Sequence, residues 1–177
     1  MATIQHDIPR THANETRFHD GGPMNLALES VLQTYACYRP DIGYVQGMSY
    51  IAAMCVNYLD EYQAFETFAN IINRHVSFSL FLLEPDTVKA FSRTFDHLFQ
   101  RALPQLHDHL LSEAVSSEIF LLDWALTLFS KALPLPLAAR LWDVYLLEGE
   151  LFFIKAALGE FSCLSFLQSL SLSRRDP

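Results

Sequence analysis

Apolar residues recur along the chain at intervals of three and four, which is the spacing of one face of an α-helix. Gly21-Gly22-Pro23 breaks the chain before residues 24–39, and Pro40 ends that segment because the residue before a proline avoids the helical region. Its apolar face is formed by Leu28, Val31, Leu32, Tyr35 and Ala36. Residues 24–39 therefore predict an amphipathic helix with one buried side.

The same periodicity predicts six more helices, and no segment alternates apolar and polar residues for long enough to indicate a strand. The predicted segments are residues 45–59, 61–74, 87–103, 116–133 and 137–147, and a last helix after residue 150. Residues 116–133 are so apolar that we expect this helix to be buried on most sides, with Pro134 and Pro136 breaking it from the next one. No repeat of fixed period is visible. The pattern predicts an irregular all-α, multi-helix domain.

Composition narrows the possible functions. The 177 residues are enough for one domain, and 51% hydrophobic residues allow a large core. The formal charge of −8 has no balancing basic block, which argues against nucleic acid or an anionic membrane as partner. Cys37, Cys55 and Cys163 are far apart, as expected of reduced core thiols in the cytoplasm. The N-terminus has no apolar signal core.

Two apolar segments are too short or too polar for a membrane span, which needs about 20 apolar residues. Tyr44–Leu59 contains Gln46, and Leu151–Leu172 contains Lys155 and Glu160. Buried or amphipathic helices explain both segments better.

Most chemical motifs are absent from the sequence. His107-Asp108-His109, with His97 before it, suggests a metal site, but ligands at i and i+2 do not share a helix face. We interpret these histidines as solvated loop residues. The phosphate-binding pattern GxxxxGK[ST] and the nucleophile pattern GxSxG do not occur. Asp123-Trp124 and Trp142-Asp143 are interpreted as helix packing with a polar edge.

Two features remain unexplained. Gln46 lies between Gly43 and Gly47 at the start of an apolar helix, where an unsatisfied buried amide would cost about 1–3 kcal/mol. It is therefore either satisfied locally or presented to another molecule. Ile4, Asp7 and Arg10 follow the spacing I-x-x-D-x-x-R, which places an apolar anchor and two opposite charges on neighbouring turns. Asp7 could hold the Arg10 guanidinium outward; an ordinary exposed ion pair is the alternative.

In combination, I-x-x-D-x-x-R and the later Y-x-Q-G-M-S resemble the TBC-domain family, the GTPase-activating proteins for Rab GTPases. The downstream "IFLLDWALTLFSKALPLPLAARLWDVYLLEG" resembles the pair of helices with a W-D motif in that family. The resemblance extends from Ile4 to Gly159. It predicts a partial TBC domain over residues 1–162, lacking helices that family members carry at both ends, and a divergent, frayed tail over residues 163–177.

The resemblance implies roles for particular residues. Arg10 would be an arginine finger and Gln46 a glutamine finger, both supplied in trans to a Rab GTPase. Five further residues would position these fingers or contact the GTPase: Ile4, Asp7, Tyr44, Gly43 and Gly47. Catalysis would occur in the active site of the partner, so we expect no independent hydrolase activity.

The resemblance also implies the partner. It would be a Rab-family GTPase in its GTP-bound form, which carries the GTP and Mg²⁺, so no metal or cofactor of the chain's own is expected. The protein would be cytoplasmic and would reach endomembranes, such as recycling endosomes, through this GTPase. Two alternatives stay open: a truncated, catalytically impaired Rab-binding or scaffold form, and an unrelated helical protein that binds a ligand in its aromatic core.

Overall fold

The computed structural model describes residues 2–173, with side chains described for residues 3–161. No strand occurs between residues 2 and 173, which confirms the predicted all-α class. The α-helices are α1 (Ala2–Asp7), α2 (Asn25–Tyr38), α3 (Met48–Tyr58), α4 (Glu61–Ile72), α5 (His75–Phe81), α6 (Pro85–Ala102), α7 (Pro104–Ser112), α8 (Glu118–Thr127), α9 (Leu135–Glu148) and α10 (Glu150–Ser173). Two short 3₁₀ helices, η1 (Ile8–Arg10) and η2 (Thr16–Phe18), follow α1.

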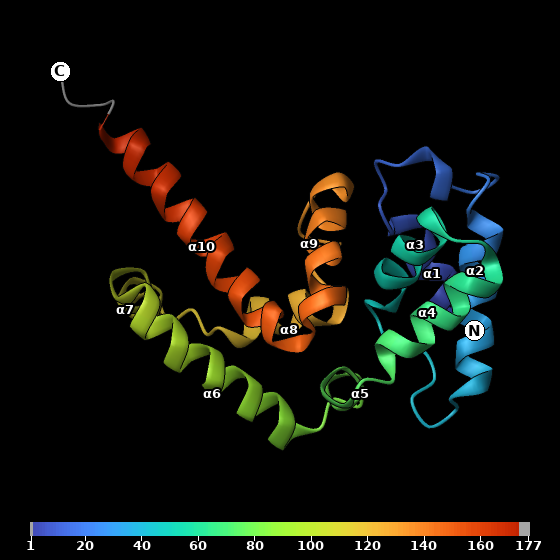
Figure 1. Ribbon diagram of the computed structural model, residues 1–177, viewed down its shortest axis with the longest axis horizontal. Coiled ribbons are helices and arrows are strands. Elements are labelled where there is room, and N and C mark those ends of the chain that lie inside the picture. The colour runs from blue at the N-terminus through green and yellow to red at the C-terminus, as the bar shows by residue number, and fades with distance from the viewer. Residues whose placement is uncertain (1, 174–177) are drawn as a thin grey trace.

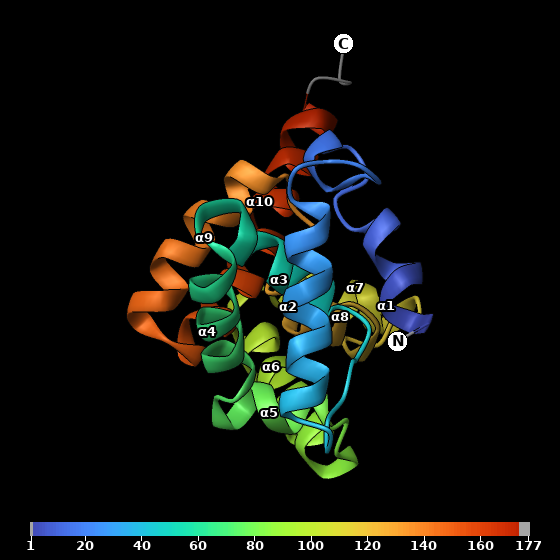
Figure 2. The ribbon, with the colours of Figure 1, turned by 90° about the vertical axis from the view of Figure 1, so that its right-hand side faces the viewer.

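The helices form an elongated molecule with two groups. Helices α1 to α4 gather at one end, whereas α6 and α7 lie at the other, and α10 runs outward from the middle (Figure 1). Figure 2 looks onto the α1–α4 end, with α6 to α8 behind it. Helix α8 joins the two groups because it packs against α3 and α5 on one side and against α6 on the other.

Helix α3 is the centre of the first group. Every residue from Met48 to Val56 except Tyr50 is buried, and the helix packs against α2, α4 and α8. The apolar run that the sequence showed is thus explained by a helix enclosed in protein. Among the described residues, no helix is both long and apolar enough to cross a membrane.

The second group is held together by aromatic rings. The ring of Phe161 on α10 stacks on Phe99 of α6 at 5.0 Å between centroids, and it also contacts Phe120 and Trp124 of α8. These contacts fix the first part of α10 against α6 and α8. The tail predicted for residues 163–177 lies beyond the described side chains, although the backbone of α10 continues to Ser173.

The helix predicted over residues 116–133 is wrong at its C-terminal end and in its burial. Helix α8 stops at Thr127, and Leu128 and Phe129 have positive φ angles of 44° and 61°. The indole Nε1 of Trp142 donates to the Leu128 carbonyl oxygen at 3.0 Å, so a partner distant in sequence stabilises the turn. The N-terminal part of α8 is also exposed, because one side of the helix faces a groove.

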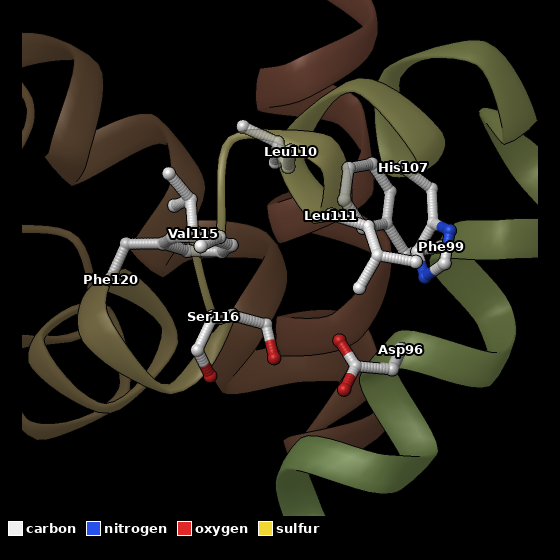
Figure 3. A pocket seen from close by; sticks show the side chains of 10 residues that line it. Asp96, Phe99, His107, Leu110, Leu111, Val115, Ser116 and Phe120 are labelled. Atoms are coloured by element: carbon white, nitrogen blue, oxygen red, sulfur yellow. The ribbon is translucent and has the colours of Figure 1, made fainter.

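The interpretation of the histidines as loop residues is also wrong, since His107 and His109 lie on α7. The His107 ring contacts the edge of Phe99 and lines a hollow between α6, α7 and the start of α8 (Figure 3). No group of three or more potential metal ligands exists within the described part of the chain. His107 therefore packs helix α7 against α6, whereas His109 is exposed.

The two cysteines with described side chains are free, as predicted, but the expectation of core thiols is wrong for Cys37, which is exposed. Burial in α3 raises the pKa of the Cys55 thiol to about 12, so it stays protonated and unreactive. Cys37 is exposed, and the side chain of Cys163 lies outside the described residues.

Candidate functional site

A change of helix type places Arg10 on the surface. Helix α1 ends at Asp7, and Pro9 lies in the first turn of η1, where its missing N–H removes no hydrogen bond. Ile4 and Ile8 are 1% and 4% exposed and anchor this segment in the core. The Arg10 side chain, in contrast, is 54% exposed. The helix is therefore irregular around Pro9, and this change directs Arg10 outward.

Asp7 is the buried partner of Arg10. Its carboxylate is 2% exposed, accepts a hydrogen bond from Arg10 Nη2 and accepts a second, of 2.5 Å, from the Tyr44 hydroxyl. Burial and the hydrogen bond to Asp7 raise the pKa of Tyr44, so Tyr44 remains a donor at physiological pH. A charge-assisted bond to a buried, doubly held carboxylate restricts the guanidinium more than an exposed ion pair would. Asp7 thus holds Arg10 as the spacing predicted.

Gln46 lies in the turn before α3, between two glycines with positive φ. Gly43 has φ = 65°, and Gly47 has φ = 105° and forms the N-cap of α3. A Cβ on Gly47 would lie 3.1 Å from the carbonyl oxygen of Leu126 on α8. Gln46 itself is exposed, so the amide suffers no desolvation penalty. The amide is therefore presented at the surface and not buried at the mouth of a helix.

Hydrogen bonds tie the Arg10 segment to the Gln46 segment. Thr11 Oγ1 lies 2.7 Å from the Asp7 carbonyl oxygen and 2.7 Å from Ser49 Oγ, and both Thr11 and Ser49 are buried. The Tyr50 hydroxyl donates to the Arg10 carbonyl oxygen at 3.1 Å. The first turn of α3 thus holds Arg10 and Thr11, and Thr11 in turn bonds to the Asp7 carbonyl oxygen.

These segments form one wall of an open groove of about 400 Å³. Asp7, Arg10, Gln46, Gly47 and Tyr50 all line it. The opposite wall comes from α8 and the residues after it, together with Leu83: Glu118, Ile119, Leu122, Asp123, Leu126, Thr127 and Lys131. The structure therefore brings Arg10 and Gln46 onto one accessible surface. Of the other residues predicted for the site, Tyr44 acts through Asp7, and Ile4 and Gly43 do not line the groove.

The α8 wall is the part of the site that sequence reasoning missed. Asp123 was interpreted as the polar edge of a packed helix, but it faces the groove and accepts a hydrogen bond of 2.6 Å from Lys131 Nζ. Glu118 and Asp123 are spaced by five residues in a segment that is otherwise almost wholly apolar. Two carboxylates in such a segment were the available signal, because charged groups on an apolar helix need solvent or a partner.

Arg10 and Gln46 give the groove exposed hydrogen-bond donors. An exposed guanidinium suits phosphate oxygens, and an exposed amide can both donate to and accept from a water molecule. Within residues 3–161, the groove contains no cluster of metal ligands. The groove can therefore contribute groups to a reaction centre carried by another molecule.

Comparison with known proteins identifies the family of the chain. The sequence profile of the Rab-GTPase-TBC domain matches residues 1–167. The chain is 42% identical to TBC1 domain family member 14 of Homo sapiens over 159 residues, and 43% identical to TBC1 domain family member 12 of Rattus norvegicus. It is 39% identical to Drainin of Dictyostelium discoideum over 158 residues. The chain belongs to the Rab-GTPase-TBC domain family.

The match covers most of this chain but little of its relatives. For the two TBC1 relatives, the aligned residues make up 90% of this chain and 23% of the relative. For Drainin, they make up 89% of this chain and 36% of Drainin. The chain thus spans about a quarter of the length of the TBC1 proteins it matches. Its membership of the family excludes the interpretation as an unrelated helical ligand-binding protein.

Proposed function

We propose that the chain is a GTPase-activating domain that binds a Rab-family GTPase in its GTP-bound form and supplies Arg10 and Gln46 in trans. One observation carries the proposal: an exposed guanidinium and an exposed amide line the same open groove. Both groups can therefore approach one phosphate of a docked partner. Hydrolysis of GTP builds negative charge on the phosphoryl oxygens, and an arginine supplied in trans stabilises that charge.

In this mechanism Arg10 donates hydrogen bonds to the γ-phosphate and the bridging oxygen. The Asp7 carboxylate and the Tyr44 hydroxyl hold the guanidinium before the partner arrives, which lowers the entropy lost on forming the transition state. Gln46 orients the attacking water in line with the bond that breaks. GTP and Mg²⁺ belong to the partner, and the chain is not a hydrolase by itself.

The first test is single-turnover GTP hydrolysis by a panel of Rab GTPases, with and without the 177-residue chain. Acceleration by the chain, and its loss in Arg10→Ala by a factor of about 10³–10⁵, would support the arginine finger. Gln46→Ala should also abolish acceleration. Helix content measured by circular dichroism should not change in either variant, because Gln46 is exposed and Asp7 keeps its hydrogen bond from Tyr44 when Arg10 is removed.

Matched controls come from the exposed surface of α6. Arg93→Ala and Gln100→Ala make the same chemical changes at exposed positions that do not line the groove. Both controls should accelerate hydrolysis like the wild-type chain. If Arg93→Ala lost as much acceleration as Arg10→Ala, instability would be the cause and the site assignment would be wrong.

Binding without catalysis is the second candidate function. Leu83 and Ile119 are 49% and 71% exposed on the groove, and such apolar side chains can hold a partner whether or not hydrolysis is accelerated. A folded chain that binds a GTP-loaded Rab GTPase without accelerating hydrolysis would be a Rab-binding or scaffold form. In both functions, the GTPase would recruit the chain to endomembranes, with recycling endosomes as the compartment to examine first.

A further inference from the structure

The turn after α8 has an unusual backbone. Leu128 and Phe129 follow one another with φ angles of 44° and 61°, a conformation that residues with a side chain seldom adopt. The Trp142 indole holds the Leu128 carbonyl oxygen at 3.0 Å, and the Phe129 N–H donates to the Trp124 carbonyl oxygen at 3.0 Å. Phe129 is fully buried. Strained backbone that the surrounding structure holds in place is often found at functional sites.

This turn determines where Ser130 and Lys131 lie. Had α8 continued as a helix, both residues would have followed its axis. Instead, Lys131 lines the groove that contains Arg10 and Gln46, and also an adjoining hollow of about 420 Å³. Arg10, Tyr50 and Lys131 line both spaces. Lys131 therefore stands beside the proposed catalytic surface.

Tyr50 lines both spaces together with the two cations Arg10 and Lys131. Its hydroxyl donates to the Arg10 carbonyl oxygen. Burial raises the pKa of Tyr50, and the positive charges of Lys131 and Arg10 oppose this rise. The carboxylates of Asp123 and Asp7, the partners of these two cations, act in the opposite direction. The two positive charges lie at the rim of the same groove because Arg10 and Lys131 both line it.

Lys131 can change its partner easily. Its ammonium group lies 2.6 Å from an Asp123 carboxylate oxygen, and both side chains are 43% exposed. Exposed ion pairs of this kind contribute little to stability, so an anion of the partner can replace Asp123. Ser130 lines the adjoining hollow, but its hydroxyl is buried and has no hydrogen-bond partner among the residues that the structure describes. The Ser130 hydroxyl is therefore closed to an incoming molecule, and Lys131 is the group next to this turn that can reach one.

We propose that Lys131 is a second cation of the site, which binds an anionic oxygen of the GTPase–nucleotide complex beside Arg10. The inference rests on the proposed function and adds a residue to it. The oxygen can come from the γ-phosphate position of the nucleotide or from a carboxylate on the surface of the GTPase. The two sources differ in whether the contact depends on the state of the nucleotide.

The test uses the 177-residue chain and four variants. Lys131→Gln keeps most of the stem and removes the charge, and Lys131→Arg keeps the charge. Lys155→Gln is the matched control, because Lys155 forms an exposed ion pair with Glu148 at 2.8 Å and does not line the groove. Arg10→Ala reports whether the proposed function holds. Each is measured in single-turnover hydrolysis by the panel GTPase that the wild-type chain accelerates most.

The same GTPase is then used in binding measurements, loaded either with GDP or with GDP, Mg²⁺ and aluminium fluoride. Loss of a hydrogen bond to a charged group predicts that Lys131→Gln lowers the efficiency of activation by about tenfold or more. Lys131→Arg should retain most of the activity, and Lys155→Gln should match the wild-type chain. A loss of affinity confined to the aluminium fluoride complex identifies the phosphate, and an equal loss with GDP identifies the carboxylate.

Two results would overturn the inference, and they are distinguishable. In the first, the wild-type chain accelerates hydrolysis, Arg10→Ala does not, and Lys131→Gln equals the wild-type chain in both assays. The proposed function then holds, but Lys131 has no role in it. If the wild-type chain neither accelerates hydrolysis nor binds any panel member, the proposed function fails and this inference fails with it.

Discussion

At the scale of single residues, the two glycines near Gln46 have different structural roles. Gly43 adopts a φ of 65°, which other residues sometimes reach, and a Cβ there would meet open space. Gly47 has φ = 105°, outside the usual left-handed region, and lies against the Leu126 carbonyl oxygen of α8. Gly47 thus allows the first turn of α3 to approach α8 closely, which sets the distance between the two walls of the groove.

Alanine substitutions at the two positions should separate these roles. We expect Gly43→Ala to lower the free energy of unfolding by about 1 kcal/mol, the cost of a left-handed residue with a side chain. Gly47→Ala should cost more, because its Cβ would also displace Leu126, and it should reduce acceleration of GTP hydrolysis by moving Gln46. Urea unfolding and single-turnover hydrolysis measure the two effects. Equal losses of stability would show that the contact with Leu126 has no energetic consequence.

At the scale of elements, the connection between α8 and α9 differs from the prediction in an informative way. Pro134 and Pro136 were expected to break the helix, but Pro134 is the N-cap of α9 and Pro136 lies in its first turn. Proline is tolerated there because the first N–H groups of a helix have no partner within it. The prolines therefore begin α9, and the turn at Leu128 and Phe129 ends α8.

Trp142→Phe should weaken this turn. Phenylalanine keeps most of the apolar ring but leaves the buried Leu128 carbonyl oxygen without the indole donor. The expected loss is about 1–3 kcal/mol in the free energy of unfolding, measured by urea denaturation. Trp124→Phe is the control, because Trp124 is half-buried and packs against aromatic rings. A loss no larger than that of the control would contradict a role of the indole N–H in the turn.

At the scale of the whole molecule, the groove combines segments that are distant in the sequence. Asp7 and Arg10 come from the N-terminus, Gln46 from the turn before α3, and Asp123 and Lys131 from α8 and its turn. Substitutions that loosen the packing of these segments should therefore affect stability and activation together. The pH dependence of folding reports on this packing through His12, which lies beside the groove between Phe18 and Tyr50.

Protonation of His12 should destabilise the folded chain. Burial lowers the pKa of His12 below its ordinary value of 6.5, with Glu15 opposing the shift and Arg17 adding to it. The unfolded chain therefore binds the proton more tightly, so this contribution to stability is complete above about pH 6.5 and is lost as the pH falls below it. Urea midpoints at about pH 7.5 and about pH 5.5 should differ less in His12→Asn than in the wild-type chain.

Asparagine is the suitable replacement because it tolerates the positive φ of 48° at position 12. His109→Asn, at an exposed position of α7, should keep the pH dependence of the wild-type chain. If His12→Asn also kept the pH dependence of the wild-type chain, another group would cause the loss of stability in acid.

The sequence by itself determined the all-α class and the approximate extents of α2, α4, α6 and α9, because contacts between residues three and four apart produce their apolar periodicity. It also led to the proposal of Arg10 and Gln46 as fingers, through a resemblance that depends on short motifs, and the structure brings both to one groove. Only the tertiary structure revealed α5 and α7, which have 7 and 9 residues and depend on packing more than on local propensity. It alone decided the end of α8 and the second wall of the groove. The reason is physical: the contacts of Gly47 with Leu126 and of Trp142 with Leu128 join residues that local periodicity does not relate.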